Sequence, residues 1–214
     1  MNSINDLPNT IPIFPLSNFI FFPNTSAPLN IFEPRYIQMI DESIKTNRMI
    51  GMAQPKNLIN PKKPELFTVG CLGKISSFNE TDDGRYIIML NGITRFNIEK
   101  EIENGKLFRE FKINFKNFED DINNREIDIS FSDLNLIFNN LKKIFQKQGY
   151  IINWNELEKQ SLDQTINTLS MASPFSKEEK QMLLEAKDLK FRKQKLEQII
   201  KLYISDNFSN KTLQ

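Results

Sequence analysis

Ile31-Phe-Glu-Pro-Arg-Tyr36 is the stretch at which the spacing of apolar residues changes from that of β-strands to that of an α-helix. Beyond it, apolar side chains recur at helical spacing and predict one helix over about 34–46. Proline suits the first helical position, because its missing N–H needs no partner there. We therefore expect the chain to leave a strand and enter a helix at Pro34.

The charged and phenolic side chains of this stretch could also be read as a catalytic group. Glu33 lies at the expected helix start, where a carboxylate can cap backbone N–H groups. Arg35 can pair with a carboxylate or bind backbone carbonyls, and Tyr36 is expected to pack inward. Charged residues at such a junction usually satisfy backbone groups that lack partners. We interpret Glu33, Pro34, Arg35 and Tyr36 as a structural motif.

Short apolar runs bounded by prolines flank the junction and are typical of strands. Prolines suit strand starts and edge strands, because proline cannot donate to a β-ladder. The predicted strands are Ile11–Leu16, Phe19–Phe22 and Pro28–Phe32 before the helix, and Arg48–Gln54 after it. The next residues, Pro55–Glu65, contain three prolines and three lysines and are predicted to form an exposed loop.

Two predicted β-hairpins follow this loop. The first pairs Leu66–Phe78 with Tyr86–Leu90 across the turn Thr81-Asp-Asp-Gly84, and the second pairs Ile93–Ile102 with Leu107–Phe115 across Asn104-Gly105. Asn91-Gly92 also has the composition of a turn, but a bulge or bend within one strand would explain it equally well. The sequence leaves these two alternatives open.

An acidic stretch poor in apolar residues then separates the strands from the rest of the chain. It includes Glu119-Asp-Asp121, and we interpret it as a solvated linker over 117–130. Residues 1–116 are expected to form a β subdomain and residues 131–214 a helical bundle, which defines an α+β protein.

Four helices are predicted in the second part from apolar residues at helical spacing. They contain Leu134–Phe145, Leu162–Met171, Met182–Ala186 and Leu189–Ile204. Ser176 and Glu179 form a capping box that opens the third helix, whose inner side is expected to carry Met182, Leu183 and Ala186.

The composition excludes several classes of enzyme. The chain of 214 residues has no histidine and one cysteine, so Ser-His and Cys-His nucleophile pairs and Cys/His zinc sites are excluded. The formal net charge of +1 gives no reason to expect a polyanionic partner. No signal peptide and no apolar run of about 20 residues is present. We expect a cytoplasmic protein without cofactors, metals or membrane partners.

The N-terminal strands and the first helix carry a family resemblance. The runs Ile11-Pro-Ile-Phe-Pro-Leu16, Phe21-Phe-Pro-Asn24, Pro28-Leu-Asn-Ile-Phe-Glu-Pro-Arg-Tyr36 and Ile50-Gly-Met52 resemble the signature of the Lon substrate-binding domain, which also occurs as a stand-alone bacterial protein. Asn24 stands where this family usually has glycine.

Later segments agree with the resemblance in the same order along the chain, so that it covers about residues 11–205. They are Val69–Ile75, Asp83–Arg85, Asn91–Ile98, Pro174–Ser176, Glu179-Lys180 and Leu183–Ala186. The resemblance implies a PUA-like antiparallel β-barrel with one helix, followed by a helical bundle. It also implies recognition of unfolded or tagged polypeptides, as a proteolysis adaptor. Lon-type peptidases use a serine and a lysine on a separate domain, and no such motif is present, which indicates a protein that is not an enzyme.

Met52, Leu58, Ile59 and Phe67 are the residues we expect to contact a polypeptide. Leu58 and Ile59 lie in the proline-rich loop, where apolar side chains can dock a partner's hydrophobic segment or fold back on the barrel. The alternative function is RNA binding through the PUA-like barrel. Acidic residues interleave with the cations of the last helix, so we interpret Lys187, Lys190, Arg192, Lys193, Lys195 and Lys201 as a solvated face.

Three further patterns have structural interpretations. Asp82-Asp83 is typical of a hairpin turn, and Glu119-Asp-Asp121 of a solvated linker, rather than of cation sites. Cys71 in an apolar strand is predicted to be a small buried residue. The stretch Gly70–Ser76 lacks the glycine spacing and the following helix of a phosphate-binding loop.

Overall fold

The computed structural model describes residues 4–17, 19–56, 63–122, 134–147, 149 and 152–209, with side chains to residue 205. The chain divides into two compact units, Met1–Asn124 and Arg125–Gln214. The boundary lies within the expected linker, although the described end of that segment, residues 117–122, folds as part of the first unit.

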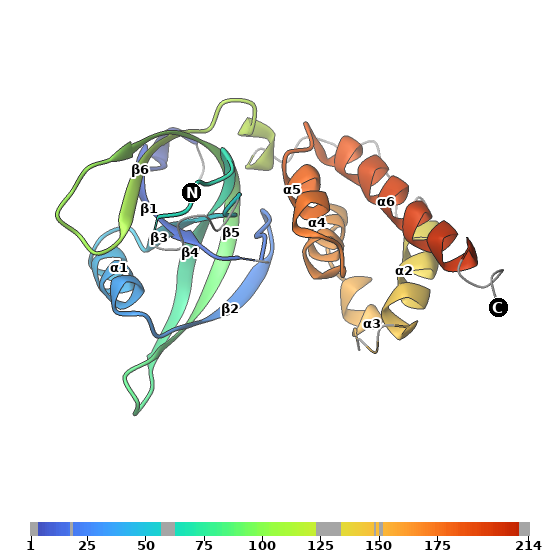
Figure 1. The fold of residues 1–214 in the computed structure, drawn as a ribbon, viewed down its shortest axis with the longest axis horizontal. Helices are drawn as coiled ribbons and strands as arrows, with labels where there is room; N and C mark the ends of the chain where they lie inside the picture. Colours follow the sequence, from blue (N-terminus) through green and yellow to red (C-terminus); the bar gives the residue numbers. More distant parts are fainter. Residues whose placement is uncertain are drawn as a thin grey trace. The chain divides into compact units, whose positions relative to one another are not determined.

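The first unit is a six-stranded sheet that closes into a barrel (Figure 1). The strand order is β2-β5-β4-β3-β1-β6, and an additional pairing of β5 with β6 closes it. In chain order the elements are η1 (Ile4–Asp6), β1 (Thr10–Pro15), β2 (Ser26–Ile31), α1 (Pro34–Lys45), β3 (Met49–Ala53), β4 (Val69–Glu80), β5 (Tyr86–Ile102), β6 (Arg109–Asn114) and η2 (Glu119–Asp121). The expected α+β architecture is thereby confirmed.

Two details of the sheet differ from the prediction. β1 and β3 pair in parallel, with Ile13 opposite Gly51, so the sheet is mixed rather than antiparallel. Phe19–Phe22 is not a strand. The backbone carbonyl of Phe22 accepts a hydrogen bond from the Thr25 hydroxyl (2.7 Å), and Asn24 has a left-handed backbone conformation with φ of 56°. A turn therefore buries these aromatic residues without a β-ladder, and Asn24 tolerates the conformation that glycine would favour.

β5 runs through Asn91-Gly92 as one continuous strand. The register with β4 shifts there, since Leu72 pairs with Thr94 and Gly73 with Gly92, which leaves Ile93 as an extra residue. The bulge alternative is thus the correct one. A Cβ atom on Gly92 would overlap the backbone carbonyl oxygen of Phe22. Glycine is therefore needed at position 92, where the segment before β2 lies against β5.

The barrel interior is filled by aliphatic and aromatic side chains from β1, β3, β4, β5 and β6 and from residues next to them. Its central cluster consists of Leu7, Ile11, Ile13, Met49, Ala53, Leu66, Leu72, Phe96, Phe111 and Ile113. All five residues of β3 are buried, and α1 packs on β1 and β3. Cys71 is fully buried, as predicted.

The described residues of the second unit form the four predicted helices and one further short helix. They are α2 (Asn135–Lys147), α3 (Trp154–Leu157), α4 (Leu162–Ala172), α5 (Lys177–Leu184) and α6 (Leu189–Ser209). α6 packs against α2, α4 and α5. Trp154 in the unpredicted α3 makes edge contacts with Phe138 and Phe145 at ring-centre distances of 6.0 and 5.8 Å. Met182, expected on the inner side of its helix, is 38% exposed instead, because α5 turns Leu183 and Leu184 inward.

The predicted capping box opens α5 and is extended by a tyrosine. The Ser176 hydroxyl accepts from the Glu179 backbone N–H (3.2 Å), and the Glu179 carboxylate accepts from the Ser176 backbone N–H (2.7 Å). The same carboxylate accepts from the Tyr203 hydroxyl (2.9 Å), whose ring contacts Phe175. This network ties α6 to the start of α5.

Tyr203 is expected to make the second unit sensitive to alkaline pH. Burial, followed by the hydrogen bond to Glu179, raises the pKa of Tyr203 to about 12. An unfolded tyrosine ionises near pH 10, so this stabilisation is present below about pH 10 and is lost as the pH rises towards about 12. Trp154 fluorescence should report a fall in stability across this window, and Tyr203→Phe should flatten that fall. An equally steep fall in the variant would contradict the assignment.

Candidate functional site

The predicted polypeptide contacts do not form a common open surface. Met52 is 3% exposed in β3, a strand whose five residues are all buried, so its side chain does not line an open surface, and its contact with a polypeptide stays a prediction. Phe67 is half-buried, and its backbone N–H donates to the carbonyl of Gln54 (2.9 Å). Leu58 and Ile59 lie outside the described residues, and they stay a prediction.

The Glu33–Tyr36 motif forms a junction between β2 and α1. Arg35 pairs with the Glu33 carboxylate (2.7 Å), and its guanidinium lies 4.6 Å from the centre of the Tyr36 ring. Tyr36 is 4% exposed and packs against Phe14, and burial raises the pKa of its phenol. Glu33 caps through its backbone carbonyl, which accepts from the N–H groups of Tyr36 and Ile37, and not through its side chain. This geometry holds the start of the helix and offers no reactive group.

A three-stranded arm extends from the barrel and carries exposed apolar side chains. We define the arm as β2 (26–31), the far part of β4 (76–80), the near part of β5 (86–91) and the turn between them; Figure 1 shows the β4–β5 hairpin projecting beyond the barrel. Phe78 is 41% exposed, Ile87 46%, and Phe32, directly after β2, 64%. Exposed aromatic and aliphatic side chains on one projecting element are typical of a docking surface.

The two faces of the arm differ. Phe78 lies opposite Ile88 and contacts the Tyr86 ring edge-on at 4.7 Å, on the face that turns towards the core. Ile87 lies on the other face, at a shallow depression of about 450 Å³ lined by Asn30, Thr81, Asp82, Asp83, Arg85 and Ile87. Both faces therefore present apolar surface to a partner.

Hydrogen bonds hold the tip of the arm in one shape. The Thr81 hydroxyl donates to the Asp83 carboxylate (2.5 Å), and Arg85 donates to the same carboxylate through Nε (2.7 Å). The hydrogen bond from Arg85 contributes most, and that from Thr81 next, to holding the pKa of Asp83 well below its usual range. Gly84 takes the left-handed conformation (φ 76°) that the turn needs. Asp83 is thus a turn residue, and the arm is pre-organised.

A second depression, of about 240 Å³, lies between the end of α1 and strands β1 and β6. Lys106 spans it and contacts the carboxylates of Glu42 (2.7 Å) and Glu110 (3.1 Å). The hydrogen bond to Glu42 is the main cause that raises the pKa of Lys106. The lysine charge is already matched by two carboxylates, so we interpret this depression as a surface ion network.

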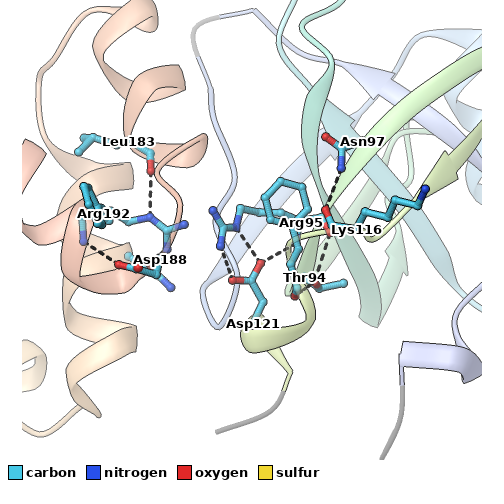
Figure 2. Close-up of polar contacts among 11 residues, drawn as sticks. Thr94, Arg95, Asn97, Lys116, Asp121, Leu183, Asp188 and Arg192 are labelled. Atoms are coloured by element: carbon cyan, nitrogen blue, oxygen red, sulfur yellow. Dashed lines mark hydrogen bonds and ion pairs between the residues drawn. The ribbon is translucent and has the colours of Figure 1, made fainter. Parts of the chain in front are cut away.

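A buried ion pair replaces the expected solvated linker at Asp121. Its carboxylate accepts from Arg95 through Nε and Nη2, both at 2.8 Å, and from the Arg95 backbone N–H at 2.9 Å (Figure 2). The side chains are 2% and 9% exposed, and the Arg95 guanidinium lies 4.4 Å from the Phe118 ring centre. Thr94 donates to the Phe118 carbonyl (3.3 Å), so residues 118–121 are bound to β5.

Arg192 also differs from its predicted place. It was assigned to a solvated basic face, but it is 2% exposed, and its Nε donates to the Leu183 carbonyl at 2.9 Å (Figure 2). Helical spacing alone could have placed it inward, since Leu196 and Ile199 follow at intervals of four and seven residues.

Among the residues described, no cluster of acidic residues and cysteine is arranged to hold a metal ion. No helix in the described part of the chain has the length and hydropathy to cross a bilayer.

Solved structures share this fold, and two of them illustrate the match. The N-terminal domain of Lon protease from Mycobacterium avium complex matches 90% of this chain and 98% of that domain, with a TM-score of 0.63 and 14% identity. A Lon N-terminal domain protein from Xanthomonas campestris matches 89% and 96%, with a TM-score of 0.60 and 19% identity. The fold is therefore that of Lon N-terminal domains.

The sequence comparison defines the family. The model of the ATP-dependent protease La (LON) substrate-binding domain matches residues 10–201, and the chain belongs to this family. Lon protease 2 of Bdellovibrio bacteriovorus is 27% identical over 96 residues, and Lon protease of Desulfosudis oleivorans 32% over 102 residues. These matches cover 44% and 45% of this chain but only 12% of either relative.

Proposed function

We propose that this chain is a non-enzymatic module that binds exposed hydrophobic segments of unfolded or tagged polypeptides and delivers them to a protease as an adaptor. Its membership of a substrate-binding family supports this proposal. The observation that carries it is the exposure of Ile87 on the outer face of the arm and of Phe32 directly after its strand β2. Burying such side chains against a partner releases water and stabilises the complex.

The arm is expected to supply most of the affinity. In the double variant Phe32→Ser, Ile87→Ser, binding of a fluorescently labelled denatured model protein should weaken by about 2 kcal/mol, roughly thirtyfold, because two exposed apolar side chains at and next to β2 lose their contacts. Fluorescence anisotropy measures the dissociation constant. Circular dichroism should show that the variant remains folded, since neither residue is fully buried.

The matched control removes equally exposed apolar side chains elsewhere. Leu107→Ser, Leu202→Ser changes residues that are 64% and 60% exposed on other elements, and it should leave the affinity within about twofold of the wild type. Equal losses in the two double variants would remove the arm from the proposal. An absence of binding by the wild type at high micromolar concentration would remove the function itself.

RNA is the second candidate ligand, and salt distinguishes it from polypeptide. Binding through phosphates weakens steeply as salt is added, whereas apolar contacts do not. The burial of Arg192 removes one cation from the basic residues of α6, which favours the polypeptide. Crosslinking and co-purification from the native cell would identify the protease partner.

A further inference from the structure

Strand β2 has one edge that no strand covers within the described part of the sheet. It pairs with β5 from Ser26 opposite Asn91 to Ile31 opposite Tyr86, and it stands at the end of the strand order. An uncovered edge presents backbone N–H and C=O groups that can pair with another chain. β2 therefore carries binding capacity that does not depend on its side chains.

Pro28 shows which backbone groups face this edge. In an antiparallel pair, the N–H and C=O of alternate residues point to the partner strand and to the opposite side. Pro28 has no N–H, so its position opposite Met89 fits a pair that exchanges no hydrogen bonds with β5. By alternation, the N–H groups of Ser26 and Asn30 and the C=O groups of all three residues point outward. The side chains of these three residues lie on the exposed face of the sheet.

We infer that a bound polypeptide adds to β2 as an extra strand, paired with the outward groups of Ser26, Pro28 and Asn30. This inference rests on the proposed polypeptide-binding function and specifies how it occurs. Backbone pairing is independent of sequence, which suits a domain that accepts many unfolded chains. Phe32, exposed at the end of β2, then lies beside the added strand and contacts its apolar side chains.

Pro28 favours a foreign strand over a second copy of this chain. A foreign strand without proline loses only the single ladder bond that Pro28 cannot donate. Two copies of β2 paired antiparallel about Pro28 would lose that bond on both sides. The edge is thus better matched to an extended apolar peptide than to itself, and a proline in the middle of an edge strand also limits aggregation.

The test uses proline itself as a backbone probe. Asn30→Pro removes an outward N–H but leaves the pairing with β5 intact, as Pro28 does naturally; Asn30→Ala removes the same side chain and keeps the N–H. For a proline-free apolar peptide of about ten residues, Asn30→Pro should weaken binding about fivefold, the effect of one lost hydrogen bond. Asn30→Ala should match the wild type.

A second measurement leaves the protein unchanged. The same peptide, N-methylated at two adjacent central residues, loses a donor on each edge and should bind at least fivefold more weakly. Binding of the wild type to the parent peptide, with no loss from Asn30→Pro or from methylation, would overturn strand addition and leave the proposed function standing. No binding to any peptide would overturn the function. Sedimentation that shows a wild-type dimer and an Asn30→Pro monomer would overturn the inference in favour of self-pairing.

Discussion

Replacing Asp121 with alanine is expected to destabilise the first unit by about 3 kcal/mol. The variant removes from the Arg95 guanidinium, 2% exposed, the carboxylate that accepts hydrogen bonds from its Nε and Nη2. Removing one partner of a buried ion pair costs far more than the pair contributes, because an uncompensated charge remains in a poorly solvated place. The loss should also release residues 118–121 from β5.

Urea unfolding followed by far-ultraviolet circular dichroism measures this effect. The control is Glu119→Ala, an exposed neighbour on the same turn, which should change the stability by less than about 0.5 kcal/mol. Trp154, the single tryptophan, lies in the second unit, so its fluorescence follows that unit separately. Equal stability of the two variants would mean that the ion pair does not hold η2 on the barrel.

Gly92→Ala is expected to have a comparable effect, also about 3 kcal/mol. The added methyl group would overlap the Phe22 carbonyl oxygen and approach the Phe21 ring at 3.3 Å. The carbonyl is backbone and is held by the Thr25 hydroxyl, so it cannot move aside as a flexible side chain would. Relief would require the segment before β2 to shift, which would expose buried aromatic surface.

Gly105→Ala supplies the comparison for this variant. A Cβ atom at Gly105 meets nothing within 4 Å, and the residue is not in a left-handed conformation. Its replacement should be neutral or stabilising by about 0.5 kcal/mol, because alanine restricts the unfolded chain. Thermal unfolding of the two variants side by side separates steric overlap from the general effect of losing a glycine. A Gly92→Ala protein as stable as Gly105→Ala would contradict the close approach.

Residue patterns predicted the elements of this fold better than their pairing. Helical spacing and Pro34 located α1 correctly, and Ser176 with Glu179 located the start of α5. The parallel pairing of β1 with β3 was missed, because short apolar runs contain no information on strand direction. Asn91-Gly92 could not be assigned, since a turn and a bulge use the same residues. What distinguishes them is the close approach of the Phe22 carbonyl to Gly92, which the sequence does not reveal.

The candidate site depends on strand pairing and burial, which residue patterns indicate less directly than they indicate helices. Met52 looked like a contact because it is apolar and follows a family motif, yet those properties are shared by core residues, and β3 is buried on both faces. The β4–β5 hairpin of the arm was predicted, but its pairing with β2 and the open edge of β2 were not, because they depend on which distant strands pair. Asp121 was taken as solvated because acidic residues usually are, and its partner Arg95 is 26 residues away.

The pairing of β1 with both β3 and β6 sets an order for folding during synthesis. The strand made first, Thr10–Pro15, reaches its neighbour β6 only after residue 114 has left the ribosome. Until then its apolar residues have no partner on that side, and such long-range closure is slow. The nascent first unit thus exposes apolar segments until β6 has been made, and rapid closure of the barrel limits their association with other chains.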